Sequence, residues 1–599
     1  MDSPSMFSMK QIKGYALGAF LTVIITTVGD AQEQAAKPGQ EPAAGGKAFD
    51  VSQVIAPRVL KMPKPKLRPQ MVGEKLAVAS PSSAAREHVK TGFALVHAQW
   101  DFEAYRHFCA ALQEDPGCLM AYTGLSLSLA QSWHAEAKYR RAAVLRITDL
   151  LEGDEKRMKE GKEARFPAIE RKFSAATAIL LSASPQAAGL SFKSLGKEFP
   201  HFLQARLLGI FLTRGGYDVL GNPSEAQKIA VKDALELLAK HPENPLVIGF
   251  WLALNAEAPS AAINLKTDLL PYARKLAKQN PDVPSWQHFL GHFEWRAGNY
   301  LLAERAFRKS ADLYAAWMKE NSVSHNDCAG YFKAKCYLAN SHYQRGDFVG
   351  AMKVAKELRA YKPDPKRPQS EGNQMLFWRA YTLPARLYMA HGADGDMNRA
   401  QKSLPTVEEM KPFTANRKFP TLAGAYVDAL RTYTGVRKAI DDKAHTAATS
   451  LHKKTFRRYI ASMARVSKGA SRAADYSHFL RAGSSLAIYD MELAGLVSLC
   501  GPRDLRLAAA NWFRSARDKQ IIPSQMMPPA IPNPMENRLG DYYRLKGDYK
   551  SAYDAYAAGN SRYPNNMQSL KMMLMCLEKQ GKKDQAAVIK KHIELIKPK

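Results

Sequence analysis

Apolar residues recur at helical spacing through most of the chain from residue 84 onward. Residues three and four positions apart share one face of a helix, so this spacing is typical of amphipathic helices. No alternating β-branched run is flanked by the Asn-Gly or Asp-Gly turns that mark β-hairpins. The pattern therefore predicts an all-α fold.

The apolar pattern is clearest in a pair of predicted helices near the C-terminus. Its landmarks are Leu539, Gly540, Tyr543, Gly547, Asp548, Tyr549, Ala552, Tyr556 and Pro564. The small residues Gly540 and Ala552 allow two antiparallel helices to cross closely, and Pro564 ends the second helix. This spacing resembles the tetratricopeptide repeat, whose fold is an α-α superhelix of antiparallel helical hairpins. A further unit begins 34 residues on, where Gly581 follows Gly547.

Similar units occur elsewhere along the chain, for example around Gly92 and Phe108 and around Gly291 and Phe307. The predicted order is a signal peptide at 1–31, a linker at 32–83, repeats at 84–150, degenerate helical hairpins at 151–283, central repeats at 284–365, a further helical region at 366–532 and C-terminal repeats at 533–599. In the central repeats, the helix between the two units is expected to extend through Asp312 to Asn326. A loop rich in proline precedes the last repeats; its prolines are Pro523, Pro528, Pro529, Pro532 and Pro534.

The chain is strongly basic, with 86 Lys and Arg against 56 Asp and Glu and a net charge of +30. A hydrophobic content of 46% nevertheless excludes a wholly disordered basic protein. The only apolar run near the length of a bilayer span extends from Gly14 to Val28, which is shorter than the ~20 residues a spanning helix needs. Because lysines precede this run and small residues follow it, it is typical of a secretory signal. The mature chain is expected to begin near Gln32 and to be periplasmic or secreted.

Residues 32–83 are rich in Pro, Ala and Gly and carry many Lys and Arg residues. We interpret them as an extended, solvated basic linker of polyproline character. The six cysteines form no C-x-x-C motif, which leaves zinc ribbons and redox motifs unsupported. Cys109 and Cys118 are the only local candidate pair for a disulfide, and buried free thiols are the favoured interpretation for the others.

No sequence motif for catalysis or phosphate binding is present, and no cofactor is predicted. His288 and His292 lie four residues apart on a predicted helix, as two metal ligands would, but no third ligand is evident. The resemblance places both histidines on the concave face of the superhelix, which is the favoured interpretation.

The resemblance also implies which other side chains line the concave groove. The set consists mainly of polar residues at the groove positions of each first helix: Arg86, His288, His292, Lys333, Asn340, Tyr343, Asn537, Asp541 and Arg544. Since folding does not require polar groups at these positions, we expect them to bind a protein or peptide segment. The basic members favour an acidic partner.

Residues 443–472 carry eight Lys and Arg residues and no Asp or Glu. They fit a basic amphipathic helix that could bind an anionic envelope surface, but the solvated face of a helix packed on the core is the more common use of such a pattern. Because the chain is expected to be exported, a nucleic-acid partner is not favoured. The leading hypothesis is an exported, non-enzymatic scaffold, and the alternative is a metal- or cofactor-binding enzyme on a helical-repeat scaffold.

Overall fold

The computed structural model describes residues 49–71, 76, 78–130, 137–182, 184–218, 221–367, 370–414, 422–461, 476–524 and 527–598. The predicted signal peptide and the linker up to residue 48 lie outside this part of the chain. The described residues form helices and two isolated bridges but no strand, which confirms the all-α fold. None of the described helices has the length and apolar character of a membrane span.

The chain divides into two compact units. Unit 1 comprises Met1–Trp286 together with Ala316–Ser324, and unit 2 comprises Gln287–Ala315 together with His325–Lys599. Two helices, α13 (Pro284–Arg296) and α14 (Tyr300–Glu320), contribute residues to both units. Residues of the range 284–365, predicted as central repeats, thus fall in both units.

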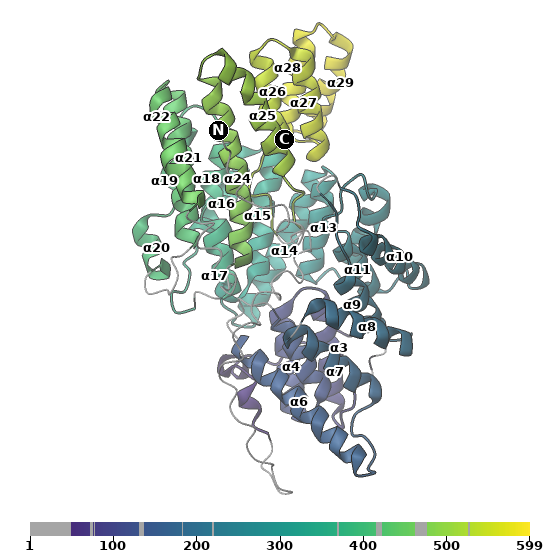
Figure 1. Cartoon of the computed structure of the whole chain (residues 1–599). Coiled ribbons are helices and arrows are strands. Elements are labelled where there is room, and N and C mark those ends of the chain that lie inside the picture. The colour runs from purple at the N-terminus through teal and green to yellow at the C-terminus, as the bar shows by residue number, and fades with distance from the viewer. Residues whose placement is uncertain are drawn as a thin grey trace. The chain divides into compact units, whose positions relative to one another are not determined.

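Unit 1 is a succession of helices that pack against their neighbours in sequence (Figure 1). Its helices are η2 (Val51–Gln53), α2 (Pro57–Leu60), η3 (Pro69–Met71), α3 (Ser83–His97), α4 (Asp101–Glu114), α5 (Leu119–Ser128), α6 (Ala137–Lys159), α7 (Ala168–Ser182), α8 (Pro185–Glu198), α9 (Leu203–Thr213), α10 (Glu225–Lys240), α11 (Pro245–Leu254), η4 (Leu265–Leu269) and α12 (Leu270–Gln279). Helix α3 contacts α4 and α5, and it also contacts α11, which lies far along the sequence. The helices of unit 1 thus curve back on themselves.

A glycine facing an aromatic ring marks the close crossings in unit 1. A Cβ atom on Gly92 in α3 would lie 2.7 Å from the Phe108 ring of α4, and one on Gly124 in α5 would lie 2.1 Å from the same ring. Real Cβ atoms do not approach other atoms so closely, so only glycine fits at these positions without a shift of the ring. Phe108 is fully buried and fills the space between the three helices.

Unit 2 continues the same succession of helices. They are η5 (His325–Asp327), α15 (Ala329–Gln344), α16 (Phe348–Ala360), α17 (Glu371–Met375), η6 (Leu376–Ala380), α18 (Leu383–His391), α19 (Asp396–Ser403), α20 (Val407–Thr414), α21 (Leu422–Asp441), α22 (His445–Ser450), η7 (Leu451–Phe456), α24 (Tyr476–Leu499), α25 (Arg503–Lys519), α26 (Glu536–Leu545), α27 (Tyr549–Arg562), α28 (Met567–Lys579) and α29 (Lys583–Ile596). Helix α14 ends at Glu320, so the predicted continuation to Asn326 is wrong. Ser322, with a φ of 53°, turns the chain there.

The same glycine–aromatic crossing recurs in unit 2. A Cβ atom on Gly291 would lie 2.6 Å from the Phe307 ring, and one on Gly540 would lie 2.4 Å from the Tyr556 ring. Both crossings were predicted from the repeat pattern. A third crossing lies in the region 366–532, which was predicted only as helical: a Cβ atom on Gly495 of α24 would lie 2.4 Å from the Phe513 ring of α25.

Residues 54–71 are not a solvated linker. Val54 and Ile55 are fully buried, and the Tyr105 hydroxyl accepts a hydrogen bond from the Ala56 backbone N–H at 2.9 Å. The buried Arg106 donates to the Pro63 carbonyl at 2.7 Å. The solvated interpretation is wrong here because prolines exclude a long helix but do not prevent a segment with short helical turns from packing on α4.

None of the six cysteines forms a disulfide, and Cys500 is partly exposed whereas the other five are buried. The candidate pair Cys109 and Cys118 is not joined, and burial raises the pKa of the Cys118 thiol to about 12.

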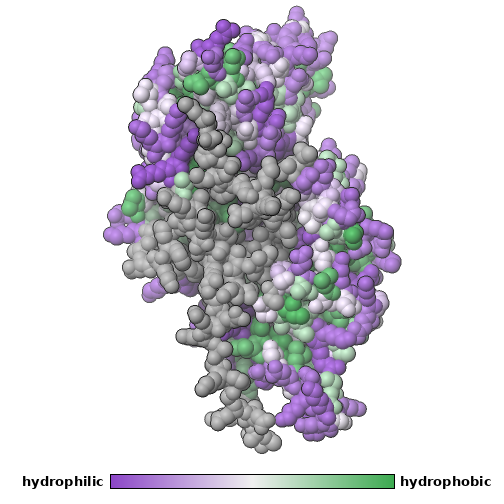
Figure 2. Space-filling view, in the orientation of Figure 1, coloured by the Kyte–Doolittle hydropathy of each residue, from purple (hydrophilic) through white to green (hydrophobic). Residues whose placement is uncertain are grey.

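Polar residues dominate the described part of the face shown in Figure 2, with apolar residues interspersed among them. This surface is consistent with the high net charge.

Candidate functional site

The nine predicted groove residues are divided between the two units. Arg86 belongs to unit 1, where its guanidinium donates to the Ser80 carbonyl at 2.5 Å and so braces the segment that precedes α3. The other eight belong to unit 2. Their surroundings differ, and only some of them face an extended segment of the chain.

The two histidines of α13 are buried among aromatic rings. The His292 Nδ1 atom lies 3.3 Å from the Tyr337 hydroxyl, and the His288 ring packs against both Phe307 and Tyr337. Across the described residues, no group of three or more His, Cys, Asp or Glu side chains is arranged to hold a metal ion. The pair therefore takes part in packing around Tyr337.

Beside these rings runs the proline segment, which we define as residues 527–534. Tyr337 lies within hydrogen-bond distance of the Met527 carbonyl at 3.1 Å and also contacts the Ser524 carbonyl. Gln344 donates to the Pro532 carbonyl at 2.6 Å, and the Tyr343 hydroxyl donates to the Asn533 side-chain oxygen at 3.0 Å. The side chains that bind the segment come from α15, one of the predicted first helices of a repeat.

Arg386 of α18 completes this set of donors. Its guanidinium donates to the carbonyls of Pro529 and Ala530 at 3.3 and 3.1 Å, and to the carbonyl of Arg379 at 3.0 Å. The side chain is fully buried, with 1% of its surface exposed. We call Tyr337, Tyr343, Gln344 and Arg386 the donor face, because each binds the chain through an N–H or O–H group.

The proline segment is held at its base as well as along its length. The Gln520 side chain donates to the Asn533 carbonyl at 2.9 Å and accepts from the Met535 backbone N–H at 2.7 Å. Asn533 in turn donates to the Ala390 carbonyl at 2.7 Å. Ile531 is buried in the core cluster of unit 2. The proline segment thus forms the last part of the loop between α25 and α26, and the Gln520 side chain links the start of this loop to its end.

The remaining predicted residues are occupied in other ways. Asn340 is buried, and its side-chain oxygen has no hydrogen-bond partner among the described atoms. Asn537 accepts from the Ser569 hydroxyl at 2.9 Å, and Asp541 accepts from the Tyr556 hydroxyl at 2.8 Å. Lys333 is half-buried, and the Arg544 side chain is 38% exposed. The structure brings Tyr343 to the proline segment but leaves Asn537 and Asp541 within the C-terminal helices.

Sequence reasoning missed Tyr337, Gln344 and Arg386. Tyr337 and Gln344 lie on the same helix as Tyr343, but the groove positions of the repeat do not include them. Arg386 lies outside the clear repeats. The clustered prolines were the available signal, since carbonyls of a buried proline segment require donors from elsewhere.

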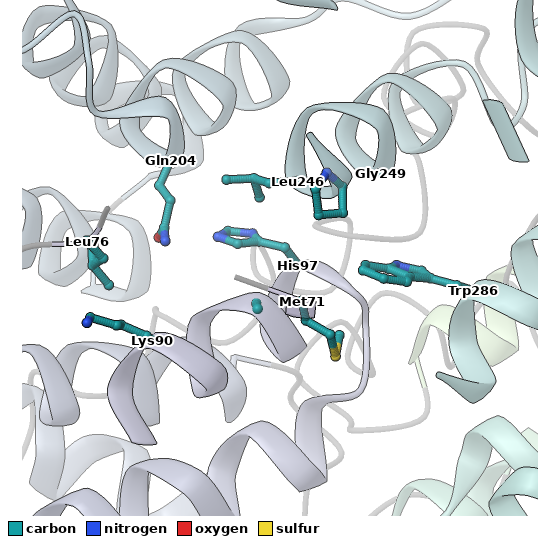
Figure 3. A pocket seen from close by; sticks show the side chains of 10 residues that line it. Met71, Leu76, Lys90, His97, Gln204, Leu246, Gly249 and Trp286 are labelled. Atoms are coloured by element: carbon teal, nitrogen blue, oxygen red, sulfur yellow. The ribbon is translucent and has the colours of Figure 1, made fainter. Parts of the chain in front are cut away.

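A second candidate is a small pocket inside unit 1 (Figure 3). His97 of α3 lies beside Gln204 of α9, and Trp286 lies on the other side of His97 in this view. Both ring nitrogens of His97, the Gln204 side-chain oxygen and the Trp286 N–H are buried without a hydrogen-bond partner among the described atoms. Burial lowers the pKa of His97 to about 4, so the ring is neutral at pH 7. The space suits an ordered water molecule and is small beside the pockets that hold substrates.

The basic segment 443–472 is described as far as residue 461. Phe456 is buried, and His452 and Arg457 contact the same oxygen of Asp490 at 2.7 and 3.1 Å. Lys453 and Lys454 are exposed. The described part is therefore packed on the core through one side and exposes cations on the other.

No protein-family model matches the chain, and no curated protein matches it. Among solved structures, the human IFIT1 dimer with m7Gppp-AAAA is 12% identical, with 90% of this chain and 93% of that chain covered and a TM-score of 0.27. The P58(IPK) TPR domain is 12% identical, with 83% and 99% covered and a TM-score of 0.18. Naa15/Naa10 bound to HypK-THB is 12% identical, with 85% and 89% covered and a TM-score of 0.26.

At these TM-scores the similarity to solved structures is too weak to define the fold. The architecture is therefore described from the packing of the helices in this chain. Consecutive helices pack in pairs in both units. A glycine meets an aromatic ring at the crossing in three of the predicted hairpins. The architecture is that of a helical-repeat protein and fits a tetratricopeptide-repeat protein.

Proposed function

We propose that the chain is an exported, non-enzymatic scaffold that binds segments of other proteins through side chains on its helical repeats. The observation that carries this proposal is the donor face, which holds a non-helical segment through its backbone carbonyls. Recognition of main-chain groups suits the binding of peptides. Stacked hairpins also provide an extended surface on which such donors can be repeated.

The charge of the chain favours acidic partners. A net charge of +30 attracts anionic segments over distances of about 10 Å at moderate salt. Exposed cations such as Lys453 and Lys454 add a second route to anionic envelope surfaces. Binding through either route should weaken as the salt concentration rises.

The test of scaffold function uses the mature chain, residues 32–599, against a displayed library of random peptides. We expect saturable binding of selected peptides, and cross-links from them to helices of unit 1 or unit 2. The heat-unfolded chain is the control for non-specific capture. Selection of no peptide above that control would contradict the proposal, and cross-links confined to 443–461 would move the site to the basic segment.

Export is tested separately, by expressing the full chain in a bacterium with a periplasm and sequencing the N-terminus of the recovered protein. We expect a mature chain that begins near Gln32. Recovery of protein from the cytoplasm that still begins at Met1 would contradict export while leaving the scaffold function open to test.

A further inference from the structure

We propose that the donor face is a receptor for proline-rich peptides that carry an acidic residue, and that the proline segment occupies it as an internal ligand. This inference rests on the proposed scaffold function and specifies its partner. In the structure, the donor face contacts carbonyls of Met527, Pro529, Ala530 and Pro532. A partner peptide would present the same carbonyls in place of the proline segment.

The chemistry of the donor face explains the preference for proline. Its four side chains contact carbonyl or amide oxygens of the loop, and all of them act there as donors. A peptide without proline would bring a backbone N–H at each residue, and each buried N–H needs an acceptor. No backbone N–H is present at the four prolines of the segment, Pro528, Pro529, Pro532 and Pro534. Proline also fixes the φ angle of the free peptide, so less conformational entropy is lost on binding.

Apolar contact sets the spacing within the ligand. Ile531 lies between Pro529 and Pro532 in sequence and is 6% exposed. It packs in the core cluster that also contains Met535. A ligand of this class therefore places one large apolar side chain between two prolines.

The acidic residue follows from the charge around Arg386. This fully buried guanidinium donates hydrogen bonds to carbonyl and hydroxyl oxygens, which are neutral acceptors. Burial and the charges of Arg386 and Arg481 lower the pKa of the nearby Arg379 to about 9. The region is thus rich in buried positive charge. A carboxylate would form charge-assisted hydrogen bonds, which are about twice as strong as neutral ones.

That gain matters because the internal ligand is tethered. A flexible tether gives a segment an effective concentration in the millimolar range, so a partner with the same contacts would not displace it at lower concentration. A carboxylate beside the prolines of a partner peptide would form the charge-assisted hydrogen bond that the proline segment lacks. Because Gln520 joins the two ends of the loop, the loop can leave the donor face without separating α25 from α26.

The experiment measures binding of three labelled peptides by fluorescence anisotropy. The first has the sequence of residues 524–531, which the loop variant described below lacks, the second carries A530E, and the third has every proline replaced by alanine. The protein is the mature chain and a variant in which residues 522–531 are replaced by Gly-Ser-Gly. We expect the loop variant to bind the first peptide at least tenfold more tightly than the parent, the second more tightly still, and the third not at all.

Arg386→Gln in the loop variant should abolish the preference for the second peptide, whereas Arg399→Gln should not, because Arg399 is a surface residue with a 59% exposed side chain. If the loop variant loses its helical circular dichroism, Asn533→Ala in the full chain provides the same test. This change removes the Asn533 side-chain contacts to Tyr343 and Ala390 and leaves the donor face intact. We expect it to raise affinity for the first peptide severalfold.

Equal binding of the proline and alanine peptides by a folded variant would overturn the inference, as would no binding of any of the three. Library peptides of other composition that still bind the same variant would leave the scaffold function standing. If neither the library nor the three peptides bind, both proposals are wrong.

Discussion

Gly483 and Gly495 lie on the same helix, α24, but only Gly495 packs closely against another helix. A Cβ atom on Gly495 would lie 2.4 Å from the Phe513 ring, whereas one on Gly483 would meet no described atom within 4 Å. We expect Gly495→Ala to lower the free energy of unfolding by ~1 to 3 kcal/mol through overpacking. Gly483→Ala should raise it by roughly 0.5 to 1 kcal/mol, because alanine favours the helix. Thermal unfolding of the two variants checks the opposite signs, and shifts of the same sign would contradict the crossing.

Glu170 is a buried carboxyl whose protonation should affect stability. Burial raises its pKa to about 7, although one oxygen accepts from the Ala79 backbone N–H at 2.5 Å. In the unfolded chain the group ionises near pH 4.5, so ionisation in the folded chain costs stability as pH rises from about 4.5 to 7. We expect Glu170→Gln to raise the melting temperature more at pH 8 than at pH 5. An equal effect at both pH values would show that this carboxyl does not titrate within that window.

At the scale of elements, the two short helices before α3, η2 and α2, are held by contacts with α4. The Tyr105 hydroxyl binds the buried Ala56 backbone N–H, and the adjacent Val54 and Ile55 are fully buried. Tyr105→Phe leaves that N–H without its acceptor, at a cost of about 1 to 3 kcal/mol. We expect faster hydrogen exchange in residues 51–60, with Tyr139→Phe as the control. Unchanged exchange would mean that apolar burial alone holds the segment.

Elements differ in how well their sequences predict them. The hairpins around Gly92, Gly291 and Gly540 were predictable because a glycine faces an aromatic ring at a fixed spacing. The hairpin of Gly495 keeps the same contact at a different spacing, with eighteen rather than sixteen residues to its aromatic partner, which hides it from a strict repeat pattern. The proline loop was predictable as a break between helices, but its burial was not.

At the scale of the whole molecule, unit 1 takes part of its core from a later stretch of the chain. Trp317, within Ala316–Ser324, donates to the buried Glu103 carboxylate at 3.0 Å and packs against Trp100 and Phe102. We expect a fragment of residues 49–324 to show a cooperative thermal transition that a fragment of 49–286 lacks or shows at lower temperature. Circular dichroism melts check this, and identical melts would mean that residues 316–324 are dispensable to unit 1.

The sequence by itself determined the helical class, the hairpin crossings around Gly92, Gly291 and Gly540, and the proline-rich break before the C-terminal repeats, because these depend on spacing and on local backbone preference. It also identified Tyr343 as a polar group on a repeat helix, but it could not show what that group binds. Only the tertiary structure decided that Tyr337, Gln344 and Arg386 meet carbonyls nearly 150 to 190 residues away in the chain. Hydrogen bonds between distant segments leave no period in the sequence, since each partner needs only the right group in the right place after folding.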